Sequence, residues 1–373
     1  MKEMNAVTLR ERLEAGEPLE VVDIREPDEF ESWHIYGSRN IPVYDALKSG
    51  EDVDLAAKAG GLSTANPVVT VCRSGVMSKR AATLLESAGF EAISLQGGIR
   101  GWGAVWSIAD VPFDRDGAVL LQIRRNGKGC LSYLFGVDGK ACVVDPCVDV
   151  DAYLETAQQH GLEIVQVLET HVHADHLSRA RALCHVTGAD LMMPRNQRVT
   201  FEYNPIDDGA DLTLGGMRVE AIGTPGHTGE STCYLVEDQV LLTGDTLFAT
   251  AVGRPDLEKG DEGAEAGAHM LFGSLHEKLF DRFDDMAFYP AHTSDPIGFD
   301  SKPIGGTMAA SRSEQVLLEL DKPAFVERIL GSLQAKPPNH HGIIAVNEGK
   351  KDLGAIDPLD VEAGPNRCAA GGH

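Results

Sequence analysis

Strand-like and helical patterns alternate along the first hundred residues. Short apolar runs, which are typical of buried strands, lie at residues 19–24, 68–72 and 92–95. Helical spacing predicts helices at residues 8–15 and 79–88. In the first of these, Thr8 and Glu11 have the spacing of a capping box, so we expect Thr8 to be the N-cap. Strands that alternate with helices pair in parallel, and this pattern therefore predicts an α/β domain whose parallel sheet is flanked by helices.

A different pattern begins near residue 118. Strand-like runs lie at residues 119–123, 132–135 and 141–145. Asp138 and Gly139 form a hairpin signal between the last two runs, which indicates antiparallel pairing. The last stretch is rich in Gly, Ala, Pro and Asp and lacks a core pattern. We therefore expect a first domain at residues 1–108, a linker at 109–117, a second domain at 118–348 and a flexible C-terminal tail at 349–373.

The composition narrows the range of partners and compartments. A formal net charge of −24 disfavours nucleic acid and anionic membranes, because both would repel the protein. There is no apolar run of about 18 residues that would predict a membrane span, and the N-terminus lacks the apolar stretch of a signal peptide. Seven irregularly spaced cysteines do not form a disulfide framework. We expect a cytoplasmic enzyme that forms a homo-oligomer.

A cluster of metal-ligand residue types follows one predicted strand of the second domain. The run THVHADH at residues 170–176 places three imidazoles and a carboxylate directly after the apolar segment 164–168. Three further candidates each follow an apolar run and lie beside or close to Gly or Pro: His227, Asp245 and His292. Ligands on loops that leave rigid strands can converge on one point. The sequence therefore predicts a metal site at the ends of four strands.

This HxHxDH signature, with its later histidines and aspartate, resembles the metallo-β-lactamase superfamily over residues 118–347. The resemblance implies an αββα sandwich with its metal site at one edge. One form of the superfamily, the glyoxalase II type, is a dizinc thioester hydrolase. In that form His171, His173 and His227 would hold one ion, Asp175, His176 and His292 the other, and Asp245 would bridge them.

Motifs after Asp245 favour a second form of the superfamily. The segments at residues 252–257, 271–275 and 336–341 resemble the persulfide dioxygenases, especially the bacterial ones fused to a rhodanese domain. That resemblance implies one Fe(II) per chain, held by His171, His227 and Asp245. Four other residues would then orient the ligands and bound water: His173, Asp175, His176 and His292. Arg254 is a candidate for binding substrate, and a salt bridge to Asp256 is its alternative role.

Cys72 is the candidate nucleophile of the first domain. It ends a predicted strand, and the N–H groups of the following loop and helix would favour its thiolate. The loop and the motifs at residues 23–30, 34–42 and 95–102 resemble the rhodanese family over residues 5–105. The resemblance implies sulfur transfer through a Cys72 persulfide, cradled by Arg73, Ser74, Gly75, Val76, Met77 and Ser78. Met77 replaces a second arginine of many members, so a persulfide or sulfite is a better partner than thiosulfate.

The two resemblances together predict an enzyme of sulfide metabolism. A dioxygenase would oxidise glutathione persulfide, or a similar low-molecular-weight persulfide, with O2 to sulfite. The rhodanese domain would combine that sulfite with sulfane sulfur to give thiosulfate, or would load the thiol carrier. The alternatives are the dizinc hydrolase with an accessory rhodanese domain, and a sulfur-carrier or sensing module. We expect structural roles for Cys130, Cys142, Cys147, Cys184 and Cys233, and none for Cys368.

Overall fold

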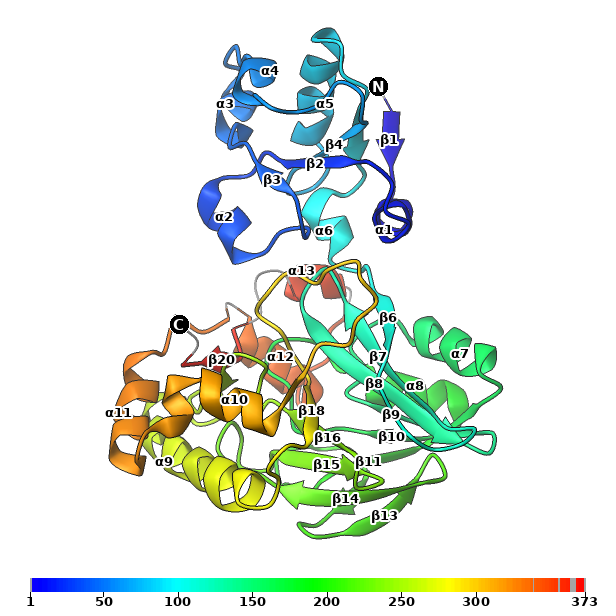
Figure 1. Ribbon diagram of the computed structural model, residues 1–373, viewed down its shortest axis with the longest axis vertical. Coiled ribbons are helices and arrows are strands. Elements are labelled where there is room, and N and C mark those ends of the chain that lie inside the picture. Colours follow the sequence, from blue (N-terminus) through cyan, green and yellow to red (C-terminus); the bar gives the residue numbers. More distant parts are fainter. Residues whose placement is uncertain (1, 338, 355, 363–366, 372–373) are drawn as a thin grey trace.

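A narrow N-terminal domain stands on one end of a larger second domain (Figure 1). The computed structural model describes residues 2–337, 339–354, 356–362 and 367–371. The short helix α13 (Pro358–Val361), from near the C-terminus, lies where the two domains meet, beside α6 (Gly98–Trp102). No described helix is both long enough and apolar enough to cross a membrane.

The N-terminal domain is the predicted α/β unit. Its strands all pair in parallel, in the order β1 (Lys2–Met4), β5 (Ala92–Leu95), β4 (Val68–Val71), β2 (Glu20–Asp23) and β3 (Arg39–Asn40). One face packs on the helices α3 (Tyr44–Ser49), α4 (Leu55–Lys58) and α5 (Met77–Ser87). The other face packs on α1 (Ala6–Glu14) and α6, with Leu9 and Trp102 in its core. The rhodanese-like arrangement of a parallel sheet between helices is confirmed.

Helix α1 begins earlier than the capping-box spacing predicts. Asn5 is the N-cap, and its side-chain oxygen accepts a hydrogen bond of 2.8 Å from the backbone N–H of Thr8. The prediction of Thr8 as the cap is therefore wrong. Asparagine caps helices at least as well as threonine, and the earlier start brings Ala6 into the core alongside Leu9.

The second domain begins before the stretch that we expected to be linker. β6 (Ser107–Asp110) pairs antiparallel with β7 (Val119–Arg125) as the edge strand of a seven-stranded sheet. Residues 109–110 thus belong to a strand, and the predicted domain boundary at 108 falls within it. A four-residue edge strand followed by Pro112 carries too short a hydrophobic pattern to be seen in the sequence.

Two sheets packed face to face form the body of the second domain. The first continues from β7 through β8 (Cys130–Val137), β9 (Lys140–Val144), β10 (Glu163–Leu168), β11 (Asp190–Pro194) and β12 (Asn204–Ile206). The β8–β9 hairpin turns at Asp138 and Gly139, both with positive φ (52° and 79°), as the sequence predicted. The second sheet has the order β13 (Asp211–Leu214), β14 (Met217–Gly223), β15 (Thr232–Val236), β16 (Val240–Gly244), β18 (Ala287–Pro290) and β19 (Gly306–Thr307).

Helices cover the outer face of each sheet. Helices α7 (Val150–Gln159) and α8 (Ala180–Thr187) cover the first sheet. The second sheet is covered by α9 (Gly260–Gly273), the π-helix η1 (Ser274–Phe280), α10 (Met308–Glu314), the 3₁₀ helix η2 (Val316–Glu319) and α11 (Lys322–Gly331). Side chains from both sheets, among them Phe135 and Tyr234, fill the core between them. The αββα sandwich is confirmed.

The C-terminal segment packs against the second domain where it is described. After α12 (His340–Asn347) and α13, β20 (Ala369–Ala370) pairs with β17 (Val252–Gly253). Glu362 is 3% exposed and forms an ion pair of 2.9 Å with Arg125. Glu362 and β20 thus pack on the second domain, while flexibility of the other described residues after 348 stays a prediction; the rest of the predicted tail lies outside the described residues. Small residues carry no periodic core pattern, but they permit the close packing that tertiary contacts stabilise here.

Candidate metal centre and sulfur-transfer loop

The predicted strand ends do converge. Parallel pairing of β16 with β18 places Asp245 and His292 at the same edge of the second sheet. The loop after β10 brings the HxHxDH run to that edge, and the loop after β14 brings His227. All seven side chains are buried, each with at most 2% of its surface exposed: His171, His173, Asp175, His176, His227, Asp245 and His292. So many buried polar groups must have partners, in the protein or in a bound ion.

His171, His227 and Asp245 form a set whose facing atoms have no hydrogen-bond partner among the described residues. Asp245 Oδ2 lies 3.7 Å from His171 Nε2 and 3.5 Å from His227 Nε2. Each of these three atoms is buried without a hydrogen bond to any residue that the structure describes. Unsatisfied buried polar atoms are rare in proteins, and here three of them meet at one point. Two imidazoles and one carboxylate on one side of an ion are the ligand set of a mononuclear iron(II) centre.

The remaining polar atoms of these three residues are held by neighbours. His227 Nδ1 lies 2.9 Å from the carbonyl oxygen of Arg254, so its Nε2 carries the lone pair. His171 Nδ1 lies 2.9 Å from the hydroxyl of Thr170, which donates to Asp145. Asp245 Oδ1 accepts from His292 Nδ1 at 2.5 Å. Such outer hydrogen bonds fix both ring orientation and tautomer, as they do around metal sites.

His173 points away from this set. Its Nε2 lies 3.2 Å from Asp145 Oδ1 and 3.1 Å from Glu169 Oε2, and it groups with these two acids. Burial lowers the pKa of His173, but the two carboxylates outweigh burial and raise it well above its usual range. Its Nδ1 is buried without a partner among the described residues. In the dizinc arrangement, that atom would have to bind the ion that His171 and His227 hold.

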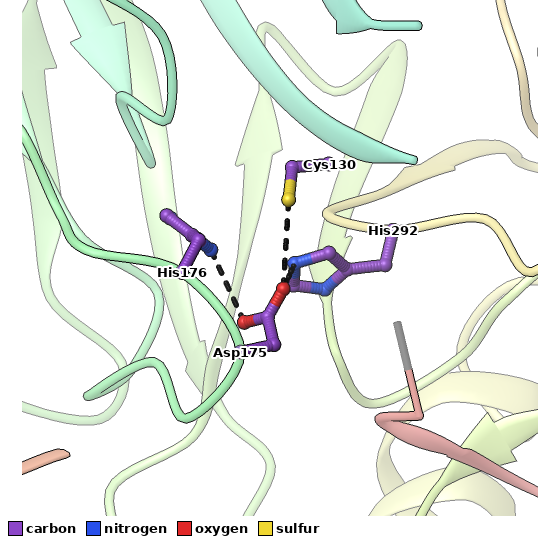
Figure 2. A group of neighbouring side chains, drawn as sticks. All are labelled: Cys130, Asp175, His176 and His292. Atoms are coloured by element: carbon purple, nitrogen blue, oxygen red, sulfur yellow. Dashed lines mark hydrogen bonds and ion pairs between the residues drawn. The ribbon is translucent and has the colours of Figure 1, made fainter. Parts of the chain in front are cut away.

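Asp175 organises a second cluster beside the first (Figure 2). Its carboxylate lies 3.1 Å from His176 Nδ1 and 2.7 Å from His292 Nε2, and it accepts a hydrogen bond of 3.5 Å from the Cys130 thiol. Burial raises the pKa of Asp175, but His292 and His176 lower it well below its usual range. His292 thus bridges Asp175 and Asp245, and so connects the two clusters.

Several residues around the centre escaped the sequence analysis. Cys130 was expected to be a core residue, and only the pairing of its backbone with His292 brings it to Asp175. Asp145 accepts hydrogen bonds from both Thr170 and His173, yet its sequence signal was only an acid at a strand end. Cys368 has its sulfur within 4.8 Å of ligand atoms of Asp245 and His292. No local motif marks any of these positions.

The side chain of Arg254 is buried and paired within the protein. Its guanidinium forms a bidentate ion pair with Asp256, at 2.7 and 2.9 Å, and donates to the carbonyl oxygens of Gln334 and Arg367. Only 1% of the residue is exposed. The salt bridge to Asp256, its alternative role, is present, and substrate binding through this side chain stays a prediction. The backbone of Arg254 still serves the site through His227.

The Cys72 loop has a cradle made largely of backbone. Cys72 is fully buried; its sulfur accepts the Gly75 N–H at 3.2 Å and lies 3.3 Å from the Ser78 hydroxyl. Gly75 has φ of 86°, and a Cβ there would lie 2.8 Å from the Gly97 nitrogen, so the turn requires glycine. Helix α5 begins at Met77, directly behind the loop.

The other loop residues add little charge to the cradle around Cys72. Arg73 pairs with Glu29 at 2.7 Å and stacks over the ring of Tyr44. Val76 is exposed, and Met77 packs against the apolar core of the domain. Arg73 and Ser74 line a cavity of about 460 Å³, whose opposite wall, in the second domain, includes Arg125, Lys128 and Glu362.

Comparison with known proteins agrees with this division of the chain. Residues 5–105 match the rhodanese-like domain, and residues 125–293 match the metallo-beta-lactamase superfamily. Persulfide dioxygenase ETHE1 of Bos taurus is 30% identical over 182 residues, which are 47% of this chain and 68% of that protein. Hydroxyacylglutathione hydrolase of Pseudomonas entomophila is 34% identical over 118 residues, 31% of this chain and 46% of that protein. The crystal structure of ETHE1 from Myxococcus xanthus shares the fold, with a TM-score of 0.55, 24% identity, and coverage of 62% of this chain and 100% of that one.

Proposed function

Because the chain belongs to the metallo-β-lactamase superfamily, is a homologue of the ETHE1 persulfide dioxygenases and has a rhodanese-like domain at its N-terminus, we propose that it is a persulfide dioxygenase with a sulfurtransferase domain. The reaction takes glutathione persulfide, or a similar small persulfide, with O2 and water to the thiol and sulfite. The observation that carries this proposal is the set of three orphaned buried atoms on His171, His227 and Asp245.

We propose that these three residues hold one Fe(II). Iron supplies one-electron chemistry with O2, which redox-inert zinc does not. Three protein ligands on one face leave positions for substrate and O2. The protein's own contribution is orientation: the Arg254 carbonyl and the Thr170 hydroxyl fix the two imidazoles. His292 occupies Asp245 Oδ1, which leaves Oδ2 as the atom that faces the site.

In the N-terminal domain we propose sulfur transfer through Cys72. The Cys72 thiolate attacks the outer sulfur of a persulfide, the sulfur–sulfur bond breaks, and the thiolate of the carrier leaves. The Gly75 N–H and the Ser78 hydroxyl stabilise the negative charge on the resulting persulfide. Sulfite then removes the outer sulfur as thiosulfate and regenerates Cys72. The tethered dioxygenase would supply that sulfite.

A dizinc thioester hydrolase is the second candidate, and specific observations favour it. Asp175, His176 and His292 gather with Cys130 into a second group of ligand types, and His173 Nδ1 lacks a partner among the described residues. Hydroxyacylglutathione hydrolases are also among the relatives. Against it, His173 Nε2 is bound by two acids, and His173 does not join the group of His171 and His227.

Oxygen uptake by the iron(II)-loaded protein tests the proposal. We expect uptake when glutathione persulfide is added, with sulfite formed in proportion, and about one iron per chain by elemental analysis. Two zinc ions per chain, hydrolysis of a glutathione thioester and no oxygen uptake by the iron-loaded protein would establish the hydrolase instead.

A further inference from the structure

A cavity of about 370 Å³ adjoins His292 and is walled by both domains. The loop at residues 293–304 forms one side, and residues 248–251, which follow Asp245, form another. Arg124 lines it from β7, and Tyr36 lines it from the N-terminal domain. The volume lies in the range of sites that bind small organic molecules, roughly 300–1,000 Å³.

Arg124 is a buried cation with an unused donor. Its residue is 1% exposed; Nε donates to the Ser107 hydroxyl at 3.2 Å and Nη1 to the Lys302 carbonyl at 2.8 Å. Its Nη2 is buried and finds no hydrogen-bond partner in the described part of the chain. The carboxylate of Asp300 lies 3.7 Å from Nη1 of Arg124, and the Asp300 side chain is 53% exposed. Burial therefore lowers the pKa of Arg124. A buried charge with so little compensation is suited to receive an anion.

The strand register places Arg124 at a defined separation from His292. Arg124 pairs with Leu131 across β7 and β8, and the Leu131 N–H donates to the carbonyl of Ala291 at 2.7 Å. Two strand spacings, about 10 Å, therefore separate the backbone of Arg124 from the residue before His292. Arg124 and His292, whose imidazole donates to Asp245, thus line the same cavity.

We propose that Arg124 binds a carboxylate of the persulfide substrate, so that the metal centre selects small persulfides that carry a free carboxylate. This inference rests on the proposed dioxygenase function and names the class of its substrate. Tyr36 lies in the wall of the same cavity, so the bound carrier contacts both domains. The competing explanation is structural: Arg124 would serve only to hold the 293–304 loop through Lys302.

Two variants separate these explanations. Arg124→Gln keeps a donor for the Lys302 carbonyl and removes the charge. Gln122→Ala is the matched control, because Gln122 holds the same loop through two hydrogen bonds of 2.7 Å to Ile304 and carries no charge. Oxygen uptake is measured for each protein with glutathione persulfide and with the persulfide of glutathione diethyl ester.

We expect Arg124→Gln to raise the KM for glutathione persulfide by about 10- to 100-fold, the range of a charged hydrogen bond, with kcat unchanged. The KM for the ester should stay as in the wild type, and Arg124→Lys should restore part of the discrimination. Gln122→Ala should change the KM for both substrates by the same factor. The proposal is overturned if Arg124→Gln shifts the KM for both substrates equally, or shifts neither.

Calorimetric titration with reduced glutathione keeps the test independent of turnover. Wild-type protein should bind, and Arg124→Gln should bind about 10- to 100-fold more weakly. If the iron-loaded wild type consumes no oxygen with either persulfide, the proposed function fails and the titration alone decides the role of Arg124. Equal affinity of the two proteins, or no binding by the wild type, would reject that role.

Discussion

His292 holds two buried carboxylates at once, Asp245 through Nδ1 at 2.5 Å and Asp175 through Nε2 at 2.7 Å. Both acids are almost completely buried, and Asp245 offers its other oxygen to the metal centre. One imidazole therefore sets the position of a metal ligand and offsets part of the charge of a second acid. The proposed iron site and the Asp175 cluster cannot be varied independently of each other.

Replacing His292 with alanine should disturb the metal centre without removing any of the three proposed ligands. Asp245 and Asp175 would lose their shared partner, and loss of such an outer hydrogen bond lowers metal affinity by about 10- to 100-fold. Iron retained after dialysis against a weak chelator, measured by elemental analysis, reports the change. His185→Ala, at an exposed position, is the control and should retain iron as the wild type does. Unchanged iron retention in His292→Ala would contradict the bridging role.

Replacing Asp245 with alanine should abolish both iron binding and oxygen consumption. The variant removes the only carboxylate of the proposed ligand set, and two imidazoles alone do not hold iron(II) firmly. Iron content and oxygen uptake are measured on the same sample. Asp138→Ala, in the exposed β8–β9 turn, controls for loss of an aspartate. A variant of Asp245 that keeps its iron and consumes oxygen would exclude the proposed triad.

Replacing Cys72 with serine should separate the two activities. Sulfur transfer from glutathione persulfide to sulfite, measured as thiosulfate, should disappear because serine cannot carry a persulfide. Oxygen uptake at the metal centre should remain. Cys184→Ser, a half-buried cysteine far along the chain, should leave both activities intact. If thiosulfate still forms at the wild-type rate in Cys72→Ser, the nucleophile lies elsewhere.

Replacing Glu362 with glutamine should destabilise the second domain. It would leave the buried guanidinium of Arg125 without its ion pair, and breaking a buried pair costs about 3–5 kcal/mol. Denaturant unfolding measures the free energy. Asp357→Asn, which removes an exposed ion pair with Arg100, should change stability by at most about 1 kcal/mol.

The same pair predicts how stability depends on pH. Burial raises the pKa of Glu362, but Arg125 and Arg179 outweigh burial, and the pKa lies below its ordinary value. A carboxyl whose pKa is depressed on folding contributes stability above its unfolded pKa, about 4.3, and loses it as the pH falls further. The melting temperature of the wild type should therefore approach that of Glu362→Gln as the pH falls from about 4.5 to about 3, a range that begins near the unfolded pKa of about 4.3. A constant difference across that range would contradict this account.

Both domains and the core of the metal site were predictable because their signals are local. Alternating strands and helices predicted the parallel sheet, and the run at residues 170–176 placed four candidate ligands on one loop. His227, Asp245 and His292 could be added because each follows a strand, and strand ends meet at sheet edges. Cys72 could be picked out as the candidate nucleophile in the same way, since it follows a strand and precedes a helix.

What escaped prediction depends on contacts between distant segments. Cys130 reaches Asp175 through a bridge between the start of β8 and the loop after β18, and Cys368 reaches the centre through the pairing of β20 with β17. The guanidinium of Arg254 turned out to be occupied by a residue only two positions away and by two distant carbonyls. Local propensity does not carry such information. The place of each of these side chains in the structure depends on the distant segment that it contacts, and the neighbouring residues in the sequence do not specify that segment.

The pairing of β20 with β17 also bears on how the protein is made. Glu362 and Cys368 are translated after the residues that they contact, which are Arg125 for Glu362 and Asp245 and His292 for Cys368. A nascent chain that stops short of them exposes Arg125 as an unpaired charge and leaves the edge of β17 open. Completion of the candidate centre therefore comes late in synthesis, and the N-terminal domain can fold well before it.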